Sequence, residues 1–438
     1  MNEELLGDFL PRKISKCKKW PENVIPHPGF ETKSYDIQVI TPIFGGGTEA
    51  GVNDPVTLIR PSSIRGHLRF WWRATRGANC ATVEELRKLE GNIWGTTENP
   101  SQVIVEVSVN SHGTTYPCAY IREGKNFATF KENHPGYALF PFQGSKKEGI
   151  PIAKCTSNVP FELKLIYPQG LSVEVEAAVW AWVNFGGIGA RVRRGSGALY
   201  CQELAPPDAS GISSWYKDRL KSFGIVLTHT RQWPILPNEL LVKNSSDPYQ
   251  AWNDVIGMMQ TFRQGQNVGR NPGKAPNRPG RSRWPEPETI RSATSQRDPK
   301  HPRMPGIPND AFPRAELGLP IIFHFKDYND PKDTELYPIV GGQERTRMAS
   351  PLVLRPIVCQ NGDVQQMILC LRAASPDDVI LKNADRSARF KKIRDPMLSA
   401  YPQSPLGSPK PGLPARSPLG SAIEGFLSFA KENNFRVV

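Results

Sequence analysis

Arginine is the residue type whose spacing points most clearly to chemistry in this chain. The stretch SSIRGHLRFWWRATRG, residues 62–77, can be laid out as a helix at about 100° per residue. An arc of about 80° on that helix carries four arginines, Arg65, Arg69, Arg73 and Arg76. A separate arc of about 60° carries Ile64, Leu68, Trp71 and Thr75, and predicts the face that packs on a protein core.

Four positive charges on one helix face repel one another unless an anion lies along them. Their spacing of about 6 Å suits successive phosphates of a nucleic-acid backbone. Arg60, just before the helix, is predicted to join this face, and Trp72 beside it could stack a base. The alternative is that the arginines pair with acidic residues of a neighbouring insertion or subunit.

The second candidate site is a glycine-rich loop, GGIGARVRRGSG, at residues 186–197. It follows a predicted helix and precedes a strand, so it fits neither a Walker loop nor a dinucleotide-binding loop. Its glycines let backbone N–H groups approach an anion closely, and its arginines add charge. The residues predicted to contact a nucleic-acid backbone here are Gly187, Gly189, Arg191, Arg193, Arg194, Gly195 and Gly197.

Metal and acid–base chemistry find less support. The seven cysteines lie far apart, with no C-x-x-C pair and no histidine at zinc-ligand spacing, and are expected to be reduced core thiols. None of the seven histidines has a paired base or acid in its local sequence, so each is expected to be structural. No metal site and no cofactor is predicted.

The elements that would position the two arginine sites follow a β-α-β-β-α-β order. Alternating apolar residues predict strands at 35–39, 103–109 and 161–167, with a fourth at 198–203. Helices are predicted at 63–76 and at 173–185, the second with Ser172 as its N-cap. This order is typical of a ferredoxin-like (RRM-like) domain, an antiparallel sheet with both helices on one face. Residues 110–158 would then be an insertion that carries a hairpin or loop.

A second, looser copy of this arrangement is predicted in the rest of the chain. The expected divisions are an N-terminal extension at 1–33, a first domain at 34–205, a linker at 206–218 and a second domain at 219–438. Strands of the second domain are predicted at 223–228, 319–325, 352–358 and 364–371, and helices at 249–262 and 422–433. The fold class is therefore expected to be α+β, two tandem ferredoxin-like domains with long insertions.

Two segments of the second domain have compositions that oppose folding. Residues 263–316 are predicted to form a basic, proline-rich loop, whose part at 263–303 is expected to be mobile. It could clasp RNA, or it could be a solvated loop that only aids solubility. Residues 401–420, rich in proline, serine and glycine, are predicted to be an extended connector before the C-terminal helix.

The charge balance of the 438-residue chain favours a polyanionic partner, since 55 Lys and Arg face 42 Asp and Glu for a net charge of +13. No apolar run approaches the roughly 20 residues that span a bilayer, and residues 1–10 carry acids where a secretion signal carries Lys or Arg, so a cytoplasmic protein is expected. The aromatic signature with which RRM sheets stack bases is missing. Recognition should therefore run through helix and loops, with weak dependence on base sequence.

Three stretches, ITPIFGGG (40–47), RPSSIRGHLRFWWRATRG (60–77) and GGIGARVRRGSG (186–197), together resemble the RAMP superfamily of CRISPR effector proteins. Within it they resemble the large head-end subunit of the Cmr (type III-B) complex, with weaker support from LGLPIIFHF (317–325) and RMASPLVLRP (347–356). The resemblance implies two ferredoxin-like domains and a place where the 3′ portion of the guide RNA meets target RNA. It also implies other RAMP subunits as partners and a role in antiviral defence.

The resemblance raises one enzymatic alternative. In the backbone subunits of such complexes an aspartate between the first strand and first helix promotes target cleavage, and Asp54 falls in a comparable place. The head-end subunit is understood as a binding component, and Asp54 next to Pro55 also suits an ordinary turn. We therefore predict a non-catalytic RNA-binding subunit. A metal-dependent endoribonuclease using Asp54 and a protein-only scaffold are the alternatives.

Overall fold

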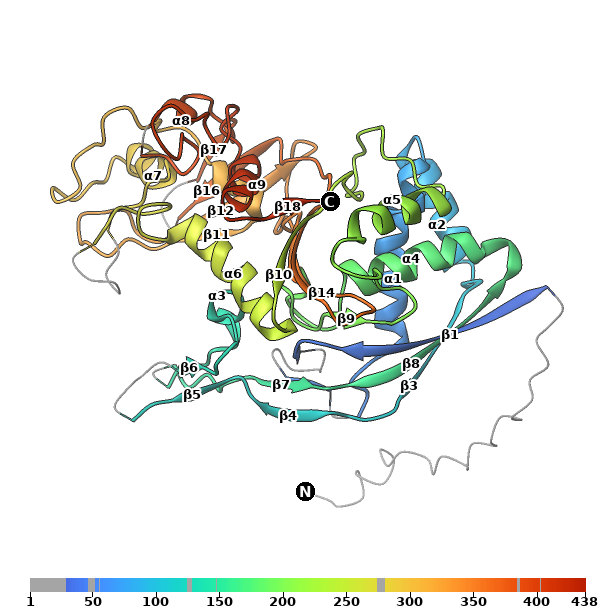
Figure 1. Ribbon diagram of the computed structural model, residues 1–438. Coiled ribbons are helices and arrows are strands. Elements are labelled where there is room, and N and C mark those ends of the chain that lie inside the picture. Colours follow the sequence, from blue (N-terminus) through green and yellow to red (C-terminus); the bar gives the residue numbers. More distant parts are fainter. Residues whose placement is uncertain are drawn as a thin grey trace, which may run out of the picture.

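The computed structural model describes residues 29–45, 52–54, 56–123, 128–146, 148–273, 280–383, 387–401 and 403–438 (Figure 1). Most of the predicted N-terminal extension, Gly46 and Gly47 of the first loop, and a part of the predicted basic loop lie outside these residues. In the described ranges no helix is long and apolar enough to cross a membrane.

The first unit has its strands and helices in the predicted order. These are β1 (Phe30–Val39), α1 (Pro61–Ala74), β3 (Ile104–Val109), β8 (Pro160–Pro168), α4 (Ser172–Phe185) and β9 (Leu199–Tyr200). In the sheet the strands lie in the order β3-β8-β1-β9, and every neighbouring pair is antiparallel. The alternating pattern predicts these strands well because every second residue of a strand such as β8 is buried.

Helices α1 and α4 cover the same face of this sheet (Figure 1). Every residue of α4 from Ala177 to Phe185 is buried. A helix that is apolar all round needs cover on more than one side. That cover comes partly from a helix at residues 212–222, whose Trp215 and Tyr216 lie against the Trp180 ring at centroid distances of 5.6 and 6.0 Å.

The insertion predicted at 110–158 is a ribbon of short strands that projects from the first sheet (Figure 1). It holds β4 (Thr114–Pro117), β5 (Ala119–Ile121), β6 (Ala128–Phe130), α3 (Gly136–Leu139), the 3₁₀ helix η4 (Phe140–Phe142) and β7 (Lys154–Ser157). Strand β2 (Ile43–Phe44) of the first loop pairs with β7, and β5 pairs with β6 as a hairpin. Three further elements flank the unit: η3 (Arg76–Asn79), α2 (Val83–Trp94) and η5 (Gln169–Leu171).

The second unit repeats the strand order of the first. Its elements are β10 (Leu241–Ser245), α6 (Pro248–Gln264), β14 (Leu352–Val358), β15 (Val364–Cys370), α9 (Ala422–Glu432) and β18 (Arg436–Val437). The sheet order is β14-β15-β10-β18, all antiparallel. The α+β class with antiparallel sheets is confirmed, and so are the predicted α6, β14, β15 and α9.

Two local predictions for the stretch between the units differ from the structure. Residues 223–228 form no strand, and β10 is the first strand of the second sheet instead. The linker predicted at 206–218 contains the start of helix α5 (Ile212–Ser222). Polar residues dominate α5, yet Ile212, Trp215 and Tyr216 are buried and hold it on the first unit.

Part of the basic segment predicted at 263–316 is folded, because among its described residues 286–294 form a helix and a 3₁₀ helix begins at Pro313. Between α6 and β14 lie α7 (Glu286–Thr294), η7 (Pro313–Leu317), β11 (Ile321–Phe323), β12 (Thr334–Val340) and β13 (Gln343–Glu344). Strands β16 (Asp378–Lys382) and β17 (Ser387–Phe390) complete a sheet in the order β11-β12-β16-β17, and α8 (Met397–Ala400) follows. Composition misled here because the charges of α7 are buried in ion pairs rather than exposed to water. Residues 401–420 contain turns, without helix or strand in their described part, and include the fully buried Leu406.

One hydrophobic core joins the two units. It contains the interior of the first sheet, α1 and α4, and also Val353 and Ile357 of β14 and Met367 of β15. The other face of the second sheet packs on α6 and α9. The six described cysteines are free thiols and five of them are buried, as expected of core residues.

Candidate nucleic-acid interface

Helix α1 separates an apolar face from an arginine face, as predicted. Pro61 stands in the first turn, where its missing N–H leaves no hydrogen bond unmade. The predicted apolar residues Ile64, Leu68, Trp71 and Thr75 are all buried. The arginine face therefore turns away from the core.

Two arginines of this face share one carboxylate. Nε of Arg69 and Nη1 of Arg73 donate to Oε1 of Glu90 at 2.7 and 2.6 Å. Glu90 belongs to α2, and its side chain is only 8% exposed. Two cations against one anion leave one net positive charge. Arg69 and Arg73 therefore pair in part with an acidic residue of a neighbouring segment, which was the alternative to phosphate binding.

A second carboxylate, Glu174 in the first turn of α4, holds the end of the face. Arg76 Nε donates to Glu174 Oε1 at 2.8 Å, and Trp72 Nε1 donates to Oε2 at 2.6 Å. Trp72 is 1% exposed. The prediction that Trp72 stacks a base is wrong, because its ring lies in the core with its N–H paired.

Arg60 and Asp54 bind each other in the loop before α1. Oδ1 of Asp54 accepts the backbone N–H groups of Val56 and Thr57 at 2.9 and 3.0 Å. These backbone donors, followed by Arg60, lower the pKa of Asp54 to about 2. Asp54 therefore stabilises a turn, which is one of the two roles predicted for it, the other being catalysis.

Arg65 differs from the other arginines of α1. Its side chain is exposed, and no hydrogen bond or ion pair joins it to another described residue. Of the predicted α1 contacts, Arg65 is the one that an external anion can reach without displacing an internal partner.

The glycine loop has a backbone that its glycines make possible. Gly189, Gly195 and Gly197 have φ of +85°, +80° and +61°, in the region that favours glycine. A Cβ on Gly187 would lie 2.7 Å from the Gly197 carbonyl oxygen, and one on Gly197 would lie 1.9 Å from that of Ile188. Gly187 and Gly197 are therefore required by close packing of the loop on itself, a reason that the sequence did not reveal.

Two of the three loop arginines reach the second unit. Arg193 donates to the backbone oxygen of Ser350, and its guanidinium lies 5.3 Å from the centre of the Phe70 ring. Arg194 Nη1 donates to the Leu352 oxygen at 2.9 Å. Burial lowers the pKa of Arg193, and burial together with nearby cations lowers that of Arg194 to about 10. These two side chains are partly occupied in joining the units.

Arg191 is the exposed arginine of the loop. It adopts the left-handed region at φ +62°, which directs the chain into the 3₁₀ helix η6 (Val192–Arg194). It has no carboxylate partner among the described residues. Within the loop, Arg191 is thus the residue best placed to bind an anion.

The structure brings the first loop and the glycine loop together. Thr41 Oγ1 donates to the Gly195 oxygen at 2.6 Å and accepts from the Ala198 N–H at 2.8 Å. The Ala190 N–H donates to the Phe44 oxygen at 2.7 Å. Because Arg193 also covers Phe70 of α1, the three motifs found in the sequence meet in one region of the first unit.

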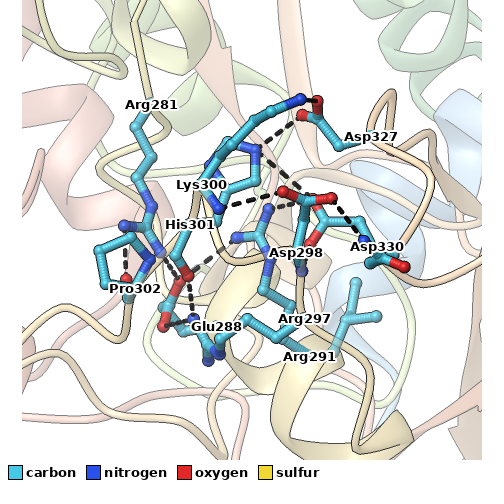
Figure 2. Close-up of polar contacts among 12 residues, drawn as sticks. Arg281, Glu288, Arg291, Arg297, Asp298, Lys300, His301, Pro302, Asp327 and Asp330 are labelled. Atoms are coloured by element: carbon cyan, nitrogen blue, oxygen red, sulfur yellow. Dashed lines mark hydrogen bonds and ion pairs between the residues drawn. The ribbon is translucent and has the colours of Figure 1, made fainter.

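A separate cluster of charged residues lies in the inserted region of the second unit (Figure 2). Arg291 binds Asp330 through two hydrogen bonds of 2.8 and 2.7 Å, and His301 Nε2 lies 2.8 Å from Asp327. His301, Asp327 and Asp330 are close enough to hold a metal ion, but Arg291 and Lys300 already contact the carboxylates. The acids that pair with His301 come 26 and 29 residues later in the chain, so its local sequence could not reveal them.

Comparison with known proteins identifies the first unit. Residues 36–200 match the RAMP superfamily. The CRISPR system Cmr subunit Cmr1-2 of Pyrococcus furiosus is 29% identical over 184 residues, which cover 39% of this chain and 95% of that protein. Subunit Cmr1-1 of the same organism is 27% identical over 143 residues, which cover 32% of this chain and 40% of that protein.

Solved structures give weaker likenesses. The crystal structure of apo Cmr1 from Pyrococcus furiosus covers 82% of this chain and 94% of its own, with 14% identity and a TM-score of 0.46. A cryo-EM structure of the Type III-B Cmr-beta bound to cognate target RNA has a chain that covers 80% of this one and 96% of its own, with 14% identity and a TM-score of 0.44.

The first unit, from β1 to β9, is a RAMP superfamily domain. Its curated relatives are Cmr subunits of a CRISPR system. Over its first unit the chain is therefore similar to Cmr-type RAMP subunits.

Proposed function

We propose that this chain is the RNA-binding RAMP subunit of a type III-B CRISPR-Cas effector complex in the cytoplasm. It contacts the backbone of guide or target RNA near the 3′ end of the guide and assembles with other Cmr-type RAMP subunits. The curated relatives are named as Cmr subunits of a CRISPR system, and this supports the proposed effector complex. The positively charged glycine loop supports the RNA backbone as the proposed ligand.

The observation that carries this proposal is the glycine loop, which exposes Arg191, while Arg193 and Arg194 beside it donate to backbone oxygens of the second unit. Three guanidinium groups follow one another within four residues, and no described carboxylate neutralises them. Cations that protein acids leave uncompensated favour a polyanion, whose counterions are released on binding. Arg65 and the net positive charge at Arg69 and Arg73 add a second, weaker contact on α1.

Asp54 gives the enzyme alternative no specific support. Its oxygens are occupied by two backbone N–H groups and by Arg60. We therefore propose a non-catalytic subunit. Incubation of the chain with RNA, with and without Mg²⁺, tests this: defined cleavage that is lost in Asp54→Ala would reverse the assignment.

Filter binding of single-stranded RNA across a salt series tests the binding proposal. The logarithm of the binding constant should fall linearly with the logarithm of salt concentration, with a slope of roughly −0.7 per neutralised phosphate. Arg191→Gln should weaken binding and flatten the slope by about that amount, since one phosphate contact is lost.

Lys217→Gln is the matched control, because Lys217 is exposed on α5 and also costs one positive charge. It should leave affinity and slope nearly unchanged. A wild-type chain that ignores RNA, while a Cmr complex still assembles around it, would favour the protein-only scaffold.

A further inference from the structure

Among the described residues, no helix covers one face of the sheet in the first unit. Helices α1 and α4 both lie on the other side of this sheet (Figure 1). Side chains alternate between the two faces of a strand, so Tyr35 of β1 enters the core while Ser34 and Asp36 point to the open face. Ser34 and Asp36 are exposed, and so is Glu106 of the edge strand β3. This face is therefore available to a partner.

The strand register arranges the side chains of the open face in three rows across β1, β8 and β3. From one end to the other the rows are Asp36, Glu162 and Ser108; then Ser34, Lys164 and Glu106; then Thr32, Ile166 and Ile104. Residues directly opposite each other on neighbouring strands have Cβ atoms about 4.5–5.5 Å apart. The face therefore has an acidic row at one end and a row with two isoleucines at the other.

The two carboxylates of the acidic row lack a cation. Lys164 in the next row is paired with Glu106, with 3.2 Å between Nζ and Oε2. Neither Asp36 nor Glu162 forms an ion pair or hydrogen bond with another described residue. Like charges directly opposite each other oppose the pairing of their strands, so the stability of the sheet does not explain this pair. A partner that brings positive charge would remove the repulsion.

The chemistry of the open face decides which kind of partner fits it. Asp36 and Glu162 repel the phosphates of RNA. The three rows also contain no aromatic side chain on which a base could stack. A protein surface that carries lysine or arginine complements the acidic row instead. Ile104, which is 51% exposed, and Ile166 beside it offer such a partner an apolar contact.

We propose that the open face of the first sheet docks a basic protein surface. Lysine or arginine side chains of the partner lie against Asp36 and Glu162, and an apolar side chain of the partner lies against Ile104 and Ile166. This inference rests on the proposed function, which supplies other Cmr-type subunits as partners, and it names the surface on which one of them docks. RNA binding by the glycine loop does not depend on it.

The test measures how the full-length chain associates with a complex assembled from the other Cmr subunits encoded with it. The double substitution Asp36→Asn with Glu162→Gln removes both charges and keeps the side chains nearly the same size. It should weaken association by about three- to ten-fold, mainly through a slower and less salt-dependent association rate. Thermal unfolding should occur at the wild-type temperature or above it, because the like charges are gone. Filter binding of RNA by the isolated chain should not change.

Asp218→Asn with Glu239→Gln is the matched control, because both acids are exposed and have no partner among the described residues. It should associate like the wild type. If the sheet variant also associates like the wild type, or if the control loses as much, the docking face is refuted while the proposed function stands.

Other occupants of the face give different results. If the isolated chain forms a dimer that the sheet variant dissolves, a second copy covers the face and the inference is wrong. If the sheet variant loses RNA in filter binding, the face serves RNA and the inference is equally wrong. If the wild type joins no complex with the other Cmr subunits, the inference and the proposed place in that complex both fail.

Discussion

Arg355 shows at the scale of one residue how the two units are joined. Its side chain is fully buried in β14 and binds no acid. Instead it donates to the backbone oxygens of Val183, Gly186 and Leu199 in the first unit at 2.9, 2.7 and 2.7 Å. Burial lowers its pKa to about 9. The carbonyl groups at the end of α4 need such a donor because they have no partner within the helix.

Replacing this guanidinium should destabilise the fold. Arg355→Met removes every donor and leaves the buried carbonyl oxygens unsatisfied, which should lower the free energy of unfolding by about 3 kcal/mol. Urea denaturation followed by circular dichroism measures the change. Arg345→Met, at an exposed site, should change it by less than about 0.5 kcal/mol. Equal stabilities for the two variants would contradict the structural role of Arg355.

Asp54 permits a test by pH. Because its pKa falls from 3.8 to about 2 on folding, the ionised turn stabilises the protein above the unfolded pKa. That contribution should be lost as the pH falls from about 4 to about 2. NMR titration of the labelled carboxyl carbons should give the low pKa directly, and Arg60→Gln should raise it. A carboxyl that titrates near 4 in the folded wild type would exclude the described turn.

At the scale of elements, sequence periodicity predicted the strands and helices whose buried residues recur regularly. It failed where the position of a side chain depends on contacts with residues distant in the sequence. The alternation of Phe161, Leu163 and Leu165 was sufficient to find β8. The helical wheel of α1 separated its faces correctly but placed Trp72 at the border. Its hydrogen-bond partner Glu174 lies 102 residues later, so the local sequence could not show that this ring is buried. Strand β10 is five residues long and α7 is rich in charge, so neither carries a pattern strong enough to identify it alone.

The glycine loop carries a prediction of its own. Gly197→Ala places a Cβ 1.9 Å from the Ile188 oxygen at a positive φ, so the backbone must move, and we expect a loss of roughly 2–3 kcal/mol of stability. Gly257→Ala is the control, because nothing lies within 4 Å of its Cβ in α6, and there we expect a gain of about 0.5–1 kcal/mol. Thermal unfolding compares the two. A Gly197→Ala chain that melts like the wild type but no longer binds RNA would show that the glycine serves the ligand rather than the packing.

For the whole molecule, the two units are mutually dependent. Helix α4 belongs to the first unit by sequence, but the apolar core around it continues into β14 and β15 of the second. The RAMP match ends at residue 200, before the elements that complete this core. The predicted linker divides the chain by sequence order. Such a division separates residues that pack in one shared core.

This dependence predicts the behaviour of a fragment. Residues 29–205 alone would expose the side of α4 that α5 and the second sheet cover, and would leave the carbonyl partners of Arg355 unpaired. We expect such a fragment to bind a hydrophobic dye and to lack the near-ultraviolet circular dichroism of packed tryptophans, whereas the full chain should unfold in a cooperative transition. Trp180 and Trp182, both fully buried in that shared core, make the signal sensitive to the missing cover. A fragment with native-like near-ultraviolet signal and sharp unfolding would instead mean that the first unit folds by itself, and that the second adds binding surface rather than stability.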